Sequence, residues 1–181
     1  MTPEQFAELA EQNYNRIPVV REVLADLETP LSCYLKLARG PYSYLFESVH
    51  GGEKWGRYSL IGLPSNTILK VFGDELVIER NGEIVESRPT TDPLKDVEDF
   101  HAQYQMPELP QLPRFTGGLV GYFGYDTVRY VEPKLKASAP PDELGNPDIL
   151  LMASDEVVIF DNLLGKLIFV VPKVAPEQNR W

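Results

Sequence analysis

The sequence predicts an α+β fold in which a few short helices accompany a largely antiparallel β-sheet. One observation is that short apolar segments rich in β-branched residues alternate with turn residues. Between two of these segments lies Asn81-Gly82, the strongest two-residue hairpin signal, because both turn positions favour positive φ. A second observation is a capping residue followed by proline, which occurs at Thr2, Thr29 and Asp92 and marks the first turn of a helix. Segments joined mostly by hairpins favour antiparallel pairing.

Three short helices are expected after these capping residues. The first runs to about Gln12, the second stops at Gly40, and the third carries His101. We expect His101 to be a boundary residue on its helix rather than a metal ligand, because no second ligand lies at helical spacing. Cys33 lies on the apolar side of the second helix, where a structural role is expected.

Strand-like segments contain most of the remaining apolar residues. The first contains Pro18 and is expected to be an edge strand or an extended lead-in, because proline cannot donate a hydrogen bond to a neighbouring strand. The last two, 149–160 and 166–171, are strongly apolar and are expected to form a hairpin that needs cover on both faces. Prolines 107, 110 and 113 predict an extended connector. The expected strands are 15–23, 42–49, 55–62, 67–72, 75–80, 83–88, 149–160 and 166–171.

A glycine-rich segment over 115–126 invites comparison with phosphate-binding loops. Its glycines at 117, 118, 121 and 124 follow neither the GxGxxG order nor the Walker pattern, which also needs a lysine. Glycines interleaved with Tyr122, Phe123 and Tyr125 instead predict a strand against which another backbone or a flat ligand packs closely.

The composition excludes several classes of function. The chain has 181 residues, enough for one domain or for part of a larger one. With 17 basic and 27 acidic residues its net charge is -10, so nucleic acid and anionic membranes are not expected partners. No apolar run approaches the roughly 20 residues that span a bilayer, and no signal peptide is recognisable, so a cytoplasmic protein is expected. One cysteine and two histidines are too few to predict a disulfide or a metal site.

Polar residues on the segments 42–49 and 55–62 form the candidate ligand site. Alternation along a strand places Leu45 and Glu47 on one face and Phe46 and Ser48 on the other, so neither face is wholly apolar. Glu47, Ser48 and Arg57 could together bind a small zwitterion, with the carboxylate on its ammonium and the guanidinium on its carboxylate. The alternative is an ordinary cross-strand ion pair between Glu47 and Arg57. No arrangement of catalytic residues is recognisable, and no catalytic residue is predicted.

Three motifs resemble the N-terminal region of the anthranilate synthase component I family of chorismate-utilising enzymes. They are Leu45-Phe-Glu-Ser48, the segment Gly51-Gly-Glu-Lys-Trp-Gly-Arg-Tyr-Ser-Leu-Ile-Gly62, and the glycine-rich segment 115–126. The resemblance covers essentially the whole chain. It implies that residues 1–181 form a single N-terminal regulatory or scaffold domain within a larger two-layered enzyme fold. The C-terminal region, which carries the chorismate site and the magnesium-binding glutamates, is absent.

The resemblance also implies a function. The family's enzyme is a Mg²⁺-dependent lyase of tryptophan biosynthesis, which makes anthranilate and pyruvate from chorismate with ammonia from a glutamine amidotransferase subunit, component II. Its Leu-Leu-Glu-Ser element helps to bind the feedback inhibitor L-tryptophan. Glu47 and Ser48 match this element, Phe46 departs from it, and Arg57 falls near a basic position of the family's site. The chain alone is therefore expected to hold no cofactor, to be inactive, and to contribute half of an effector site completed by its own C-terminal region.

Two alternatives remain open from the sequence. The chain could belong to an aminodeoxychorismate (para-aminobenzoate) synthase component I, because Gly-Arg-Tyr-Ser over 56–59 favours the anthranilate enzyme only moderately. It could also be a non-regulatory interaction module for the amidotransferase subunit. Inhibition of the complete enzyme by tryptophan would distinguish an anthranilate synthase from the aminodeoxychorismate synthase. Capture of the amidotransferase without any effect of tryptophan would favour the interaction module.

Overall fold

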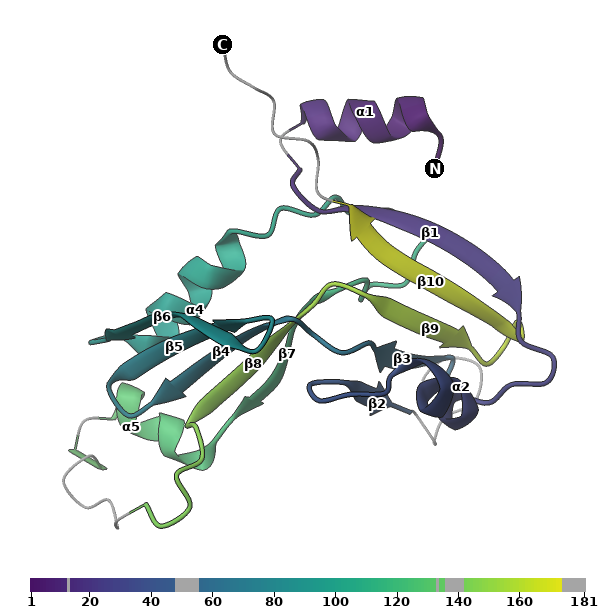
Figure 1. Cartoon of the computed structure of the whole chain (residues 1–181). Helices are drawn as coiled ribbons and strands as arrows, with labels where there is room; N and C mark the ends of the chain where they lie inside the picture. The colour runs from purple at the N-terminus through teal and green to yellow at the C-terminus, as the bar shows by residue number, and fades with distance from the viewer. Residues whose placement is uncertain (13, 48–55, 133, 136–141, 174–181) are drawn as a thin grey trace. The chain divides into compact units, whose positions relative to one another are not determined.

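The computed structural model describes residues 1–12, 14–47, 56–132, 134–135 and 142–173, and it confirms the α+β class. Two five-stranded sheets are accompanied by short helices (Figure 1). Contacts between residues divide the chain into two compact units. Unit 1 comprises 1–65, 104–118 and 154–181, and unit 2 comprises 66–103 and 119–153.

The sheet of unit 1 has the strand order β1-β10-β9-β3-β2, and each neighbouring pair in it is antiparallel. Its first strand lies at an edge, as Pro18 predicted. The candidate site lies at the other edge, where β2 pairs only with β3 among the described strands. The bounds are β1 Ile17–Leu24, β2 Tyr44–Phe46, β3 Tyr58–Gly62, β9 Val157–Asp161 and β10 Lys166–Lys173.

Two of the expected helices belong to unit 1 and begin as the sequence predicted. Helix α1 (Pro3–Glu11) starts with a capping box between Thr2 and Gln5. Helix α2 (Pro30–Leu37) starts with a second box in which Thr29 accepts from the backbone N–H of Ser32 at 3.1 Å. Each capping box gives hydrogen-bond partners to backbone N–H groups that have none within the helix. All residues of a box lie within four positions of one another, so the sequence could predict where both helices begin.

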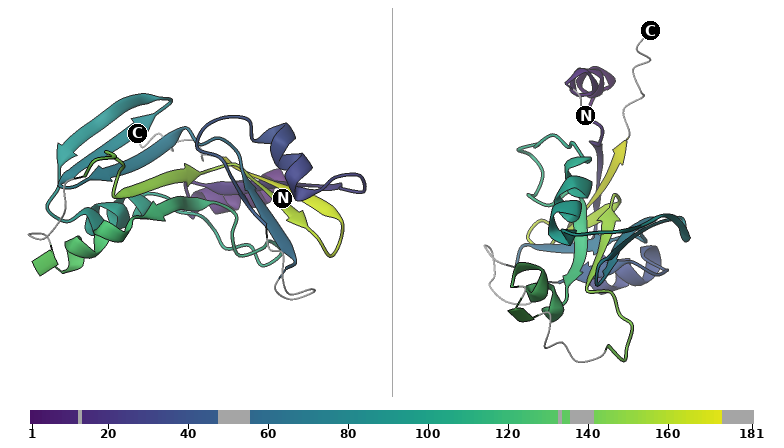
Figure 2. Two further views of the ribbon diagram at one scale, coloured as in Figure 1. Left: turned by 90° about the horizontal axis from the view of Figure 1, so that it is seen from below. Right: turned by 90° about the vertical axis from the view of Figure 1, so that its left-hand side faces the viewer.

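The sheet of unit 1 is covered on both faces, as its apolar central strands require. Helix α2 lies on one face (Figure 1, Figure 2). Cys33 of α2 and Ala38, directly after it, belong to a cluster with residues of β3, β9 and β10. On the other face, Leu112 of the proline-containing connector and Phe115, just after it, pack against a second cluster. The connector is therefore part of the core of unit 1. The two clusters consist of Ala25, Cys33, Ala38, Ile61, Val158, Phe160 and Leu167, and of Val157, Ile159, Ile168 and Val170.

Unit 2 contains the predicted hairpin and the second sheet, in the order β6-β5-β4-β8-β7. The turn between β5 and β6 has Asn81 at φ 53° and Gly82 at φ 81°, as the sequence predicted. The pairings β4–β5, β5–β6 and β4–β8 are antiparallel. The bounds are β4 Thr67–Phe72, β5 Glu75–Arg80, β6 Glu83–Pro89, β7 Gly118–Phe123 and β8 Ile149–Ser154.

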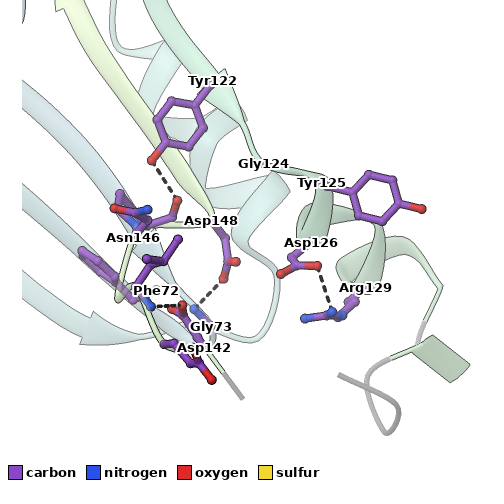
Figure 3. Close-up of a pocket in the computed structure, with 13 residues that line it drawn as sticks. Phe72, Gly73, Tyr122, Gly124, Tyr125, Asp126, Arg129, Asp142, Asn146 and Asp148 are labelled. Carbon is purple, nitrogen blue, oxygen red and sulfur yellow. Dashed lines mark hydrogen bonds and ion pairs between the residues drawn. The ribbon is translucent and has the colours of Figure 1, made fainter. Parts of the chain in front are cut away.

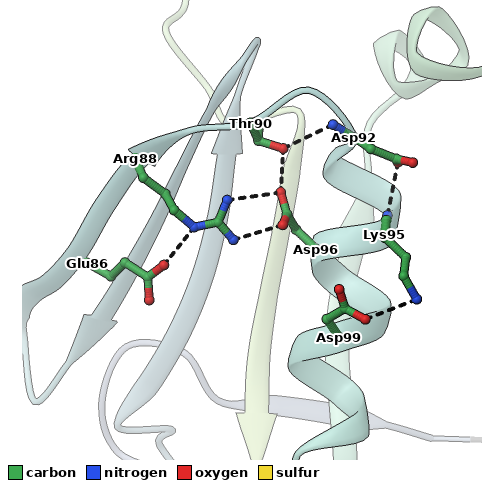
Figure 4. Close-up of polar contacts among 7 residues, drawn as sticks. All are labelled: Glu86, Arg88, Thr90, Asp92, Lys95, Asp96 and Asp99. Atoms are coloured by element: carbon green, nitrogen blue, oxygen red, sulfur yellow. Dashed lines mark hydrogen bonds and ion pairs between the residues drawn. The ribbon is translucent and has the colours of Figure 1, made fainter.

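Helix α4 (Pro93–Ala102) is held to β6 by polar contacts (Figure 4). Arg88 donates from Nη2 to Asp96 at 2.8 Å and from Nε to Glu86 at 2.8 Å. Asp96 also accepts from the hydroxyl of Thr90. The Arg88 guanidinium lowers the pKa of the Asp96 carboxyl, and it does so more strongly than the opposing effect of burial. His101 lies on this helix and is exposed, rather than at the boundary of the apolar side as the sequence predicted.

The glycine-rich segment forms β7, followed by a short 3₁₀ helix, η1 (Tyr125–Thr127), and by α5 (Val128–Val131). A Cβ atom on Gly121 would lie 1.9 Å from the carbonyl oxygen of Leu150 on β8. The segment therefore packs against another backbone, which is one of the two outcomes that the sequence predicted.

The predicted long strand over 149–160 is wrong. Residues 149–154 form β8 in the sheet of unit 2, and residues 157–161 form β9 in the sheet of unit 1. The strand breaks at Asp155-Glu156, where neither residue is buried. Ser154-Asp155-Glu156 interrupts two apolar segments, and this polar interruption does not by itself reveal that the chain changes sheets. The hairpin partner of β10 is thus β9 alone.

Candidate functional site

Strand β2 presents different side chains on its two sides, as alternation predicted. Leu45 packs against the cluster that contains Cys33. On the other side the rings of Tyr44 and Phe46 lie with their centroids 4.8 Å apart and an interplanar angle of 32°. Tyr44 is buried, whereas Phe46 is 53% exposed. The ring of Phe46 is therefore supported by the buried ring of Tyr44 while about half of Phe46 stays exposed.

Tyr44 is held by its surroundings. Its hydroxyl lies 2.7 Å from the hydroxyl oxygen of Ser154, which is also buried. Its ring lies flat over Gly62, the residue paired with it on β3, and a Cβ there would be 1.9 Å from the ring atom Cε1. Burial raises the pKa of the Tyr44 hydroxyl above its ordinary value, because an ionised phenolate would be poorly solvated there. Tyr44 therefore stays neutral and supports Phe46.

Glu47 directly follows β2 and is exposed. The edge position of β2 leaves its far side without a neighbouring strand in the described part of unit 1. Ser48, the other residue of the predicted acid and hydroxyl pair, lies outside the described residues, as do residues 49–55.

Arg57 is bound to Asp161 rather than to Glu47. Its Nη2 donates to Oδ2 of Asp161 at 2.7 Å, and its Nε donates to Oδ1 and Oδ2 at 3.2 and 3.1 Å. The guanidinium carbon also lies 4.8 Å from the centre of the Tyr58 ring, a cation–π distance. A cross-strand ion pair between Arg57 and Glu47 is therefore not present among the described residues.

Asp161 is the centre of this polar group. Its carboxylate is 2% exposed and also accepts from the backbone N–H groups of Leu163 and Leu164 at 3.0 and 3.1 Å. Burial by itself raises the pKa of Asp161, but the hydrogen bonds from Arg57 and the two N–H groups outweigh it, so the pKa lies below its ordinary value. The same interaction raises the pKa of Arg57. The ion pair thus closes the turn between β9 and β10 and fixes the start of β3.

Sequence reasoning missed Asp161 because its partner Arg57 is 104 residues away. A polar residue at the end of a wholly apolar strand is the signal that could have indicated a buried ion pair. Within the described ranges, no group of three or more His, Cys, Asp or Glu residues is placed to hold a metal ion. No helix among the same residues is long and apolar enough to cross a membrane.

Comparison with known proteins identifies the relationship that these motifs suggested. Anthranilate synthase component 1 of Pseudomonas aeruginosa is 58% identical over 181 residues, which is 100% of this chain. The protein of that name from Pseudomonas putida is 60% identical over the same length. The chain is a relative of anthranilate synthase component 1.

The relationship to anthranilate synthase component 1 concerns part of that protein. The chain spans 37% of the length of each of these two relatives. A crystal structure of anthranilate synthase component I from Streptococcus pneumoniae TIGR4 is also similar, with a TM-score of 0.48 and 23% sequence identity, over 87% of this chain and 33% of that one. No protein-family model matches the sequence.

Unit 2 of the present chain carries an open groove of about 920 Å³ that the sequence did not predict (Figure 3). Asp148 anchors one wall, where its carboxylate accepts from the N–H of Gly73 and from the hydroxyl of Tyr130, each at 2.8 Å. Burial and then the Asp148 carboxylate raise the pKa of Tyr130. Arg129 and Asp126 pair at 2.8 Å on the opposite wall. These polar side chains are hydrogen-bonded or ion-paired with one another, so we assign none of them a catalytic role.

Proposed function

We propose that this chain is the N-terminal, effector-sensing region of an anthranilate synthase component 1. The observation that carries the proposal is the identity of 58–60% over all 181 residues with proteins of that name. Similarity at this level along the whole chain is the reason we prefer this reading to an aminodeoxychorismate synthase. The complete protein would form anthranilate from chorismate in the cytoplasm, with ammonia supplied by an amidotransferase subunit.

The effector is L-tryptophan, and it binds beside the end of β2. The open edge of the sheet and the half-exposed ring of Phe46 support this placement, because an indole can stack on an exposed aromatic ring. The carboxylate of Glu47 is available for an ammonium group, since it is exposed and forms no ion pair with another described residue. Ser48 follows it directly in the sequence and would supply a hydroxyl.

Arg57 takes a different part in this proposal. Two of its nitrogens are bound to Asp161, so we assign it to positioning β3, with any contact to the effector carboxylate made by the remaining nitrogen. Catalysis is assigned to the region outside these 181 residues. The Mg²⁺ of the family is assigned to the same outside region, because the resemblance places the magnesium-binding glutamates there. It would supply charge neutralisation at chorismate.

Inhibition of the complete enzyme tests the proposal. Glu47→Gln removes the charge that pairs with the ammonium and should raise the tryptophan concentration for half-inhibition by at least about tenfold, the usual value of a charge-assisted hydrogen bond. Ser48→Phe should abolish inhibition by filling the site. Glu83→Gln, which changes an exposed glutamate on β6, is the matched control and should leave inhibition unchanged. Normal sensitivity in both site variants would refute the assignment.

Calorimetry on the 181-residue chain adds a second test. Tryptophan should bind weakly or not at all, because the other half of its site lies in the missing region. Tight binding by the chain alone would contradict this division of the site.

A further inference from the structure

Helix α2 is apolar on two sides, and the fold of unit 1 uses only one of them. Cys33 is 3% exposed and belongs to the cluster on the sheet, and Tyr34 of the same helix packs against that cluster. Leu31 and Leu35 lie one helical turn apart on another side and are 52% and 58% exposed. A helix that is apolar on opposite sides is typical of an element packed between two layers rather than at a surface.

The exposed leucines continue beyond the helix. Leu27, in the turn before α2, is 96% exposed, and Leu24, at the end of β1, is 70% exposed. With Leu31 and Leu35 they form what we call the leucine face of unit 1. Its members lie within 12 residues, and within α2 Leu31 and Leu35 lie one helical turn apart. Single exposed leucines are ordinary, but such a grouped set indicates an interface.

Polar contacts border this face. Lys36 pairs with Glu28, and Glu28 also accepts from the hydroxyl of Ser32 at 2.5 Å. These interactions fix the first turns of α2 and place charge beside the leucines rather than among them. An apolar centre with a polar rim is the usual anatomy of a protein interface.

We propose that the leucine face is covered by a part of the same longer polypeptide that lies outside these 181 residues. This inference rests on the proposed function, in which the chain is one region of a component 1. The two Pseudomonas relatives extend well beyond the match, which covers 37% of each, so they contain enough further chain to form an apolar layer over α2. A second copy of the chain is a poorer occupant, because each copy carries a net charge of -10 and two copies repel each other.

Thiol labelling tests this directly. Leu35→Cys is prepared in the 181-residue chain and in the complete polypeptide, and the rate of reaction with a maleimide is measured. Leu164→Cys is the control, because Leu164 is 54% exposed in the turn between β9 and β10 of the same unit. The native Cys33 is buried and gives the background rate. Labelling at position 35 should slow by at least about tenfold in the complete polypeptide, while labelling at position 164 stays fast.

Three results would overturn the proposal. Equal labelling of position 35 in the short and complete chains would show that the leucine face stays open. Equal slowing at positions 35 and 164 would indicate general shielding. Slowing in the 181-residue chain that grows with protein concentration would identify a second copy as the occupant. Because labelling needs no tryptophan, a complete enzyme that resists tryptophan but protects position 35 would refute the proposed effector site alone.

Discussion

Gly62→Ala tests how tightly the candidate site is built. The new Cβ would lie 1.9 Å from Cε1 of Tyr44 and 2.4 Å from two further ring atoms. The ring must therefore retreat by about 1.5 Å, a typical case of overpacking, to reach ordinary contact. Its hydroxyl is bound to buried Ser154 on one side and its face rests on Phe46, so this movement breaks a hydrogen bond and an aromatic contact.

These losses set the expected magnitude. Overpacking costs about 1–3 kcal/mol and a buried hydrogen bond about 1 kcal/mol, so Gly62→Ala should lower the free energy of unfolding by about 2–4 kcal/mol. Urea unfolding followed by circular dichroism measures it. In a Tyr44→Leu background, where the ring is absent, the same substitution should cost less than about 1 kcal/mol. An equal cost in both backgrounds would show that Tyr44 is not the obstacle and would refute the packing described for β2 and β3.

Three further predictions concern other parts of the chain. Asp161→Asn should remove the acid sensitivity that the Arg57–Asp161 pair gives to stability. Because the pKa of Asp161 is lowered in the folded protein, its stabilising contribution is present above the ordinary pKa of 3.8 and is lost as the pH falls through the lower native pKa. Thermal unfolding should therefore show that the stability of the variant changes less than that of the wild type as the pH falls below about 4. Gly121→Ala should destabilise unit 2 more than Gly62→Ala destabilises unit 1, since the obstacle is the backbone oxygen of Leu150, and rapid hydrogen exchange along β7 and β8 would report it; slow exchange there would contradict the close approach. Thr2→Ala should fray α1 by about 1 kcal/mol without lowering global stability, because α1 buries no residue; a large global loss in urea unfolding would show that α1 is part of the core.

Local signals predicted the elements that depend on local physics. Asn81-Gly82 gave the hairpin of unit 2, because the demand for positive φ is met within two residues. Thr2 and Thr29 gave the starts of two helices for a similar reason, since a cap is satisfied three residues away. Pro18 gave an edge strand through a missing donor. In each case the partner lies close in the sequence.

Features that depend on distant partners were not predictable in the same way. Arg57 was assigned to a ligand or to Glu47, and its partner Asp161 was not considered, because ion pairs across a sheet leave no trace in the spacing of either residue. The change of sheet at Asp155-Glu156 was missed, because both flanking segments are apolar strands. Glu47 was expected inside a strand over 42–49 but directly follows the shorter strand β2, whose edge position was not predicted, and its role as a ligand residue stays a prediction.

The division of the chain has a practical consequence for dissecting it. The backbone crosses from one unit to the other after residues 65, 103, 118 and 153, so each unit is interleaved with the other in sequence. No single truncation can therefore yield either unit by itself. Ending the chain at residue 65, for example, would remove β9 and β10, the strands with which β3 and β1 pair. A cut at any of these four crossings would therefore leave the sheet of unit 1 incomplete, and individual side-chain substitutions are the means by which each unit's contribution can be separated.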